Sequence, residues 1–221
     1  MNITSSNTIF LKIYRTLLKT FGPQHWWPGE TPFEIMVGAI LTQNTNWQNV
    51  STAIERIRAA NLMNPRKLLT NYRRLPQLIK TSGFYRMKSK YLHAFLHYYT
   101  TKYRGSADEM SQKRTHVLRA ELLAIPGIGP ETADSILLYA LNKRIFVVDN
   151  YTRRIFSRHN LIDYNSPYDS IQKTIEQNLP ASTNLYNEYH ALLVRIGKKY
   201  CRKNEPLCST CPLGAMLLRN R

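Results

Sequence analysis

The chain has 221 residues, in which 31 Lys and Arg outnumber 14 Asp and Glu, for a formal net charge of +17. This length suffices for one large or two modest domains, and the positive charge indicates a polyanionic partner such as nucleic acid, with a merely basic surface as the alternative. The sequence has no run of about 18 apolar residues and no apolar signal-peptide core, so we expect neither membrane insertion nor secretion. We expect the protein to be cytoplasmic and associated with the nucleoid, or otherwise intracellular.

The apolar spacing predicts helices almost throughout the chain. Apolar residues recur at helical intervals in three segments, each of which we expect to form an amphipathic helix: residues 33–41, 133–140 and 189–196. The run "IFVVD" at 145–149 is typical of a strand but has no partner run, so we interpret it as an extended connector. Gly, Pro and polar residues predict helix breaks at four places: residues 22–32, 61–67, 82–86 and 103–110. The predicted fold class is all-α.

Two glycines lie two residues apart in "IPGIGPETA". Gly127 and Gly129 separate a helix ending near Ala124 from one beginning near Pro130, where a residue without Cβ can take a positive φ and admit another backbone. Amides at the start of the second helix favour an anion such as a DNA phosphate. A tight turn between two helices, without any ligand, is the alternative.

Asp149 lies between "IFVV" and a predicted helix that begins with "NYTRR". Aspartate at this point is typical of a helix N-cap. A carboxylate held at a helix N-terminus also stays ionised at neutral pH, as stabilisation of a developing cation requires. We expect both roles.

The hairpin "IPGIGPETA" followed by "VVDN" resembles the signature of the endonuclease III superfamily of DNA glycosylases. Three other segments resemble that family and lie in its order: "MVGAILTQNTNWQNV", "IKTSGFYRMKSKYL" and "GKKYCRKNEPLCSTCP". The resemblance implies a six-helix barrel at 31–143, a second helical domain from 1–30 and 144–221 with a cysteine loop, and an active cleft between them.

By position in this family resemblance, Asp149 is the catalytic aspartate that stabilises the sugar cation. Gln43 fills the gap that a flipped base leaves, with an ordinary polar turn residue as the alternative. Family members that also cleave the strand carry a lysine directly after the hairpin, where this chain has Glu131. Without that amine a lyase step has no evident nucleophile, so we predict a monofunctional glycosylase. Nothing in the sequence places Lys143 or another lysine in that role.

The surroundings of the tryptophans resemble the branch of the family that excises 3-methyladenine. By position, Trp26, Trp27, Trp47 and Glu131 line its base pocket. Adjacent tryptophans point in different directions, so we favour Trp27 and Trp47 for stacking, with core packing as the alternative. A cationic alkylated base gains from an aromatic face and a carboxylate. The alternative substrate is a mismatched or oxidised pyrimidine.

All three cysteines lie close together, which indicates a metal site and not a disulfide framework. Cys201, Cys208 and Cys211 match three positions of the family's C-x6-C-x2-C-x5-C loop, but the fourth position holds Leu217. The resemblance implies a structural iron–sulfur cluster, 4Fe–4S in the family, here with three cysteine ligands. A 3Fe–4S cluster, a zinc site or no metal are the alternatives.

Basic residues flank this loop: Lys198, Lys199, Arg202 and Lys203. We expect them, with the hairpin glycines and Gln43, to contact double-stranded DNA that carries a damaged base, and we expect the protein to act as a monomer. A non-catalytic DNA-binding module and a metal-dependent scaffold are the alternatives from other classes. The presence of Asp149 and the charge of +17 argue against them.

Overall fold

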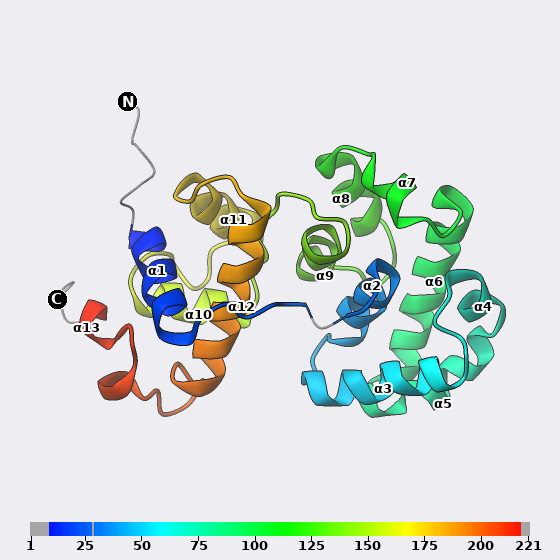
Figure 1. Cartoon of the computed structure of the whole chain (residues 1–221), viewed down its shortest axis with the longest axis horizontal. Helices are drawn as coiled ribbons and strands as arrows, with labels where there is room; N and C mark the ends of the chain where they lie inside the picture. The colour runs from blue at the N-terminus through cyan, green and yellow to red at the C-terminus, as the bar shows by residue number, and fades with distance from the viewer. Residues whose placement is uncertain (1–8, 28, 218–221) are drawn as a thin grey trace. The chain divides into compact units, whose positions relative to one another are not determined.

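The computed structural model describes residues 9–27 and 29–217, and over this part it is helical without a strand, which confirms the predicted all-α class. The chain divides into two compact units. One contains residues 27–143, and the other contains residues 1–26 with 144–221 (Figure 1). In the described part of the chain, no helix combines the length and apolarity that a bilayer span requires.

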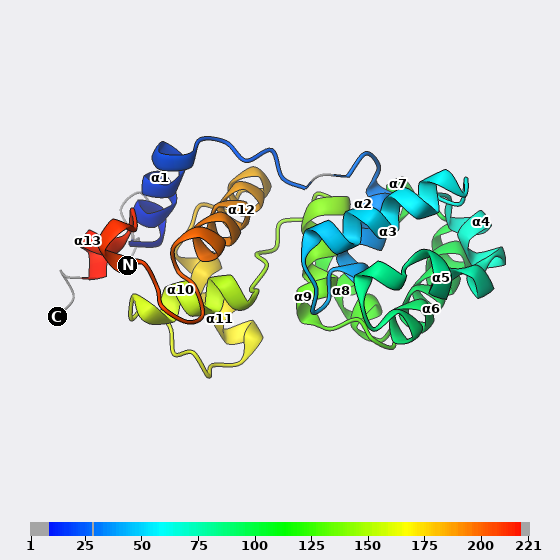
Figure 2. The ribbon, with the colours of Figure 1, turned by 90° about the horizontal axis from the view of Figure 1, so that it is seen from below.

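The unit of residues 27–143 is a bundle built around α2 (Figures 1 and 2). Its helices are α2 (Pro32–Leu41), α3 (Trp47–Ala59), α4 (Pro65–Thr70), α5 (Leu75–Leu78), α6 (Tyr85–Tyr103), α7 (Ala107–Ser111), α8 (Thr115–Leu123) and α9 (Pro130–Ser135). Short turns η2 (Tyr72–Arg74) and η3 (Lys80–Ser82) flank α5, and α9 continues into η4 (Ile136–Ala140).

Two predicted helices of this unit differ from the sequence expectation. The apolar residues of α2 are buried as predicted, but Glu34, Gly38 and Ala39 are buried too, because α2 packs against α3, α6, α9 and η4. This helix is therefore central and not amphipathic. The helix predicted over 133–140 widens into a π-helix at η4, where the amide of Leu141 donates to Ile136 O over 3.2 Å.

The other unit is built around α12 (Thr183–Lys199), which packs against α1 and α10. The predicted apolar positions of α12 are all buried: Tyr189, Leu192, Leu193 and Ile196. The Tyr189 hydroxyl donates to Phe10 O over 2.8 Å and so ties α12 to α1. The remaining elements are α1 (Ile9–Phe21), α10 (Asn150–Arg158), α11 (Tyr168–Gln177), η5 (Cys208–Thr210) and α13 (Gly214–Leu217).

Residues 145–149 form the extended connector that the sequence predicts. Side chains of α11 replace a partner strand along it: Glu176 Oε1 accepts from the Phe146 amide at 2.7 Å, and Gln172 Nε2 donates to Phe146 O at 2.5 Å. Both backbone polar groups of Phe146 are thereby satisfied although the connector is buried. The connector delivers Asp149 to the start of α10.

Candidate functional site

The two glycines of the hairpin between α8 and α9 have different roles. Gly127 has φ +84°, and a Cβ there would come within 2.1 Å of the Tyr91 ring. Both the backbone conformation and the close approach of the ring therefore require glycine at this position. Gly129 has φ −89°, and a Cβ there would meet open space. The expectation of a positive φ is therefore wrong for Gly129, and packing within the unit does not explain its lack of a side chain.

Gln43 binds the hairpin from the turn after α2. Its Nε2 donates to Gly127 O at 2.9 Å and to Thr132 Oγ1 at 3.0 Å. The predicted gap-filling residue thus fixes the hairpin turn in this structure. Insertion of the Gln43 amide into DNA would require these two hydrogen bonds to break.

The loop that contains Ser82 is fixed to the end of α2 by Lys88, a residue that the sequence analysis did not identify. Lys88 is only 2% exposed, and its Nζ donates to Leu41 O at 2.8 Å and to Ser82 O at 2.6 Å. Burial lowers the pKa of Lys88 to about 8. The ammonium therefore joins the end of α2 to the loop that contains Phe84.

Phe84 is an exposed aromatic residue in a strained backbone conformation. Its side chain is 72% exposed, and its φ of +46° lies in the left-handed region that bulky residues avoid. Core packing does not explain an aromatic ring held in this way. The adjacent "SGF" was identified only as a helix break, and the sequence gives no sign of how exposed the ring is.

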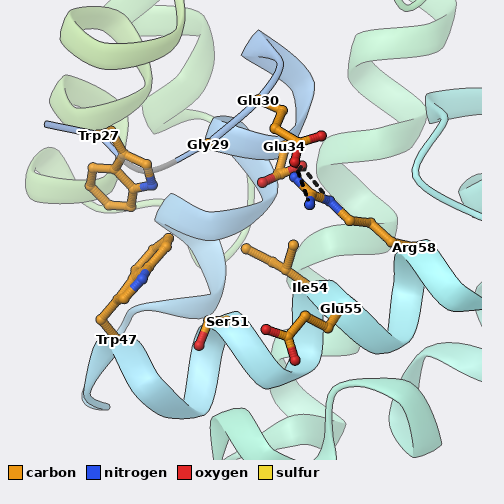
Figure 3. Close-up of a pocket in the computed structure, with 9 residues that line it drawn as sticks. All are labelled: Trp27, Gly29, Glu30, Glu34, Trp47, Ser51, Ile54, Glu55 and Arg58. Atoms are coloured by element: carbon orange, nitrogen blue, oxygen red, sulfur yellow. Dashed lines mark hydrogen bonds and ion pairs between the residues drawn. The ribbon is translucent and has the colours of Figure 1, made fainter. Parts of the chain in front are cut away.

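A cavity of about 390 Å³ lies beside two of the predicted pocket tryptophans, Trp27 and Trp47 (Figure 3). Their rings meet edge to face with centroids 5.2 Å apart, and the Tyr139 ring lies 5.1 Å from Trp27. Trp27 packs over α2 at Gly38, where a Cβ would be 3.4 Å from its indole nitrogen. The structure therefore brings together the pair favoured from the sequence.

The rest of the cavity wall is strongly acidic. It contains three carboxylates, Glu30, Glu34 and Glu55, against one guanidinium, Arg58. Arg58 pairs with Glu30 at 2.8 Å and with the buried Glu34 (Figure 3). Glu55 is exposed and makes no hydrogen bond or ion pair with another described residue. It projects from α3 one turn after Ser51.

The other two predicted pocket residues lie outside this cavity. Among the described residues, those that line it fall between positions 27 and 58. Glu131 is an exposed residue in the first turn of α9. Trp26 is half-buried and belongs to the unit of residues 1–26 and 144–221.

Asp149 caps α10 as the sequence predicts. Its Oδ1 accepts from the Thr152 amide at 2.7 Å, and its Oδ2 lies 3.4 Å from His190 Nε2 of α12. Burial raises the pKa of Asp149, but the His190 imidazole and the bonds from Thr152 outweigh this and lower the pKa below its ordinary value. The carboxylate is only 9% exposed and nevertheless ionised at neutral pH.

His190 is a positioning residue for Asp149 that the sequence analysis did not identify. In His190→Gln, burial is no longer offset by the imidazole, so the pKa of Asp149 should rise. The acid limb of the pH profile of base release should then move to higher pH, which single-turnover kinetics over a pH series would measure. The exposed His116 provides the control His116→Gln, for which we expect the wild-type profile. An unchanged profile in His190→Gln would contradict the pairing.

The three cysteines line one small cavity of about 20 Å³, the cysteine cavity. Burial raises the pKa of the Cys211 thiol, and the nearby Cys201 and Cys208 raise it further. Arg158 Nη1 donates to Cys201 Sγ at 3.3 Å. Among the described residues, no three His, Cys, Asp or Glu side chains are arranged to hold a single metal ion. Soft thiol donors with a hydrogen bond to sulfur fit the chemistry of an iron–sulfur group.

The predicted DNA-binding cations lie beside this cavity on the surface. Lys198 and Lys199 end α12, and Arg202 and Lys203 follow in the loop, all of them exposed. Leu217, at the fourth cysteine position of the family, ends α13, and its side chain lies outside what the structure describes.

The model of the family "HhH-GPD superfamily base excision DNA repair protein" matches residues 37–181, which include the hairpin and Asp149. The chain belongs to the HhH-GPD superfamily. It is 48% identical over 205 residues to a proposed DNA repair glycosylase of Methanocaldococcus jannaschii, covering 91% of this chain and 92% of that protein. It is 25% identical over 201 residues to endonuclease III of Thermotoga maritima, covering 90% and 88%.

Solved structures confirm the HhH-GPD fold. The 3-methyladenine DNA glycosylase of H. pylori, bound to 1,N6-ethenoadenine, matches with a TM-score of 0.75 and 28% identity over 86% of this chain and 97% of that one. A non-covalent endonuclease III–DNA complex matches with a TM-score of 0.79 and 21% identity over 96% and 95%. The resemblance to the endonuclease III superfamily is therefore confirmed, and this HhH-GPD chain is a DNA glycosylase.

Proposed function

We propose that the protein binds damaged double-stranded DNA and is a monofunctional glycosylase that removes a cationic alkylated purine such as 3-methyladenine. The observation that carries this proposal is the cavity in which Trp27 and Trp47 adjoin three carboxylates. The 28% identical H. pylori glycosylase, named for 3-methyladenine, supports the same substrate class.

Both the tryptophan rings and the carboxylates of this cavity would stabilise a bound cationic base. Stacking of a cation on an aromatic face contributes about 0.5–2 kcal/mol, more where water is excluded. Glu55 adds an attraction that a neutral base does not receive, because its carboxylate makes no ion pair with another described residue, while Arg58 of the same cavity pairs with Glu30 and Glu34. N-alkylation also weakens the glycosidic bond, so the site needs shape and charge more than a general acid.

Asp149 supplies the chemistry at the sugar in this proposal. The C1′–N bond breaks and its electron pair leaves with the base, which becomes neutral as it departs. The ionised Asp149 stabilises the oxocarbenium-like sugar and orients a water, whose oxygen bonds to C1′ and whose proton passes to the carboxylate or solvent.

Two lysines that could replace the missing amine are engaged elsewhere, which supports hydrolysis without strand cleavage. By family position, Glu131 stands where the lyase amine would be. Lys143 Nζ donates to the carbonyls of Ser111 and Lys113, and Lys88 Nζ donates to Leu41 O and Ser82 O and is buried. Either amine would have to leave two carbonyl partners before it could attack the sugar as the missing nucleophile does.

Contacts to DNA would come from exposed groups in both units. The hairpin of Gly127 and Gly129 offers backbone amides to phosphate, and Phe84 offers an exposed ring that can stack on bases. Lys88 and Gln43 hold these two loops. The cations Lys198, Lys199, Arg202 and Lys203 would contact phosphate, and the cysteine loop that carries the last two would be structural.

Glu55→Gln tests the substrate class. We expect release of cationic 3-methyladenine to fall by about fivefold, while release of neutral 1,N6-ethenoadenine changes little, because only the cation loses an attraction of about 1 kcal/mol. Single-turnover rates on duplexes that differ only in the lesion would measure this. Equal decreases in the release rates of both bases would show that Glu55 does not distinguish a cationic base from a neutral one.

Glu131→Gln provides the second arm of this test. If Glu131 also recognises the cation, its variant should show the same selective loss. If Glu131 only begins α9, the rates on both bases should change together. A selective loss in neither variant would contradict electrostatic recognition of a cationic base.

A further inference from the structure

The residue next to Arg158 brings a fourth donor to the cysteine cavity. This cavity is lined by His159 as well as by Cys201, Cys208 and Cys211. We propose that His159 is the fourth ligand of an iron–sulfur cluster bound by this chain, in place of the cysteine that Leu217 replaces. The proposal concerns the cysteine loop and does not depend on which base the protein removes.

The end of α10 is fixed to the cysteine loop. Arg158 Nη1 donates to Arg202 O at 2.7 Å as well as to Cys201 Sγ, and Nη2 donates to Lys203 O at 2.9 Å. The helix α10 also packs against α12, which ends just before Cys201. His159 follows Arg158 directly and is therefore held against the same loop.

The side chain of His159 has no other evident structural role. It is 7% exposed, and its imidazole makes no hydrogen bond or ion pair with another described residue. The backbone amide of His159 already closes α10 by donating to Ile155 O at 3.2 Å. A buried histidine that lines a thiol-lined cavity can supply an imidazole nitrogen as an iron ligand, as histidine does in clusters that combine both donors.

The cysteine loop can move outward to admit a cluster while exposing little additional buried surface. The cysteine cavity is only about 20 Å³, but Cys208 and residues 202–207 on its outer side are exposed. The loop is held at its base, where the Leu207 amide donates to Tyr200 O at 2.9 Å. Outward movement of Cys208 would leave Cys201, Cys211 and His159 on the protein side.

Iron content and spectroscopy of protein purified without oxygen test this proposal. The wild type should hold about four irons per chain, and His159→Ala about three, with the EPR signal of a three-iron cluster and faster loss of colour in air. His159→Cys should retain four irons at a lower reduction potential, because thiolate replaces imidazole. The exposed-residue control His116→Ala should match the wild type.

A double variant separates ligation from folding. His159→Ala combined with Leu217→Cys restores a fourth donor at the family spacing, so four irons should return while the alanine stays in place. Thermal melts of every variant would show whether the unit remains folded. Wild-type iron content and EPR spectrum in His159→Ala would overturn the proposal. So would zinc, or no metal, in the wild-type protein.

Discussion

Asp149→Asn should lower the single-turnover rate of base release at least about 10²-fold while DNA affinity stays within a few-fold of the wild type. Asparagine keeps the shape of the side chain and can still cap α10 by accepting from the Thr152 amide. It lacks the charge that faces the sugar cation. Base release and binding to a duplex with an abasic-site analogue would be measured separately.

Asp163→Asn is the matched control for this change. Asp163 is an exposed aspartate of the same unit whose Oδ1 accepts from the Asn165 amide at 3.0 Å, so it caps a turn without facing a histidine. We expect wild-type activity for it. Near wild-type base release in Asp149→Asn would remove the catalytic assignment, provided that thermal melting shows the unit to be folded.

Gly127→Ala should destabilise the unit of residues 27–143 by about 2–5 kcal/mol. Alanine is strained at φ +84°, and its Cβ would lie 2.1 Å from the Tyr91 ring, so that the ring or the hairpin backbone would have to shift. Chemical denaturation followed by fluorescence and circular dichroism would measure the loss. A fully stable variant would contradict the close approach of hairpin and ring.

Gly129→Ala is the companion variant that separates stability from DNA binding. With φ −89° and open space around the new Cβ, we expect its stability to stay within about 0.5 kcal/mol of the wild type. If the hairpin backbone approaches phosphate, the methyl group should still weaken DNA affinity severalfold. Unchanged affinity would leave Gly129 without the proposed contact.

Local features of the chain were predictable because they depend on near neighbours in sequence. The α12 core positions, the connector at 145–149 and the capping role of Asp149 each follow from spacing or from adjacent residues. The choice of Trp27 and Trp47 for stacking on the base came from the family resemblance and stays a prediction, whereas the edge-to-face contact between their rings is a finding of the structure. Residue propensity and apolar periodicity predict secondary structure and burial well where these depend on residues that are close in sequence.

Features that depend on distant contacts were not predictable in this way. The pairing of His190 with Asp149 joins α12 to the start of α10, and no local pattern marks His190 as the partner. The amphipathic interpretation of α2 was wrong because neighbours cover the helix on all sides. The role of Glu55 depends on its orientation on α3 relative to Trp27, which lies outside that helix.

Product analysis on duplex oligonucleotides that each carry one defined lesion would show which base the protein removes and whether it cleaves the strand. We expect free 3-methyladenine to be released and the strand to remain intact at an abasic site until alkali is added. We also expect slower release of oxidised or mismatched pyrimidines. Preferential release of a pyrimidine, or strand cleavage with an enzyme–DNA adduct that borohydride traps, would contradict it.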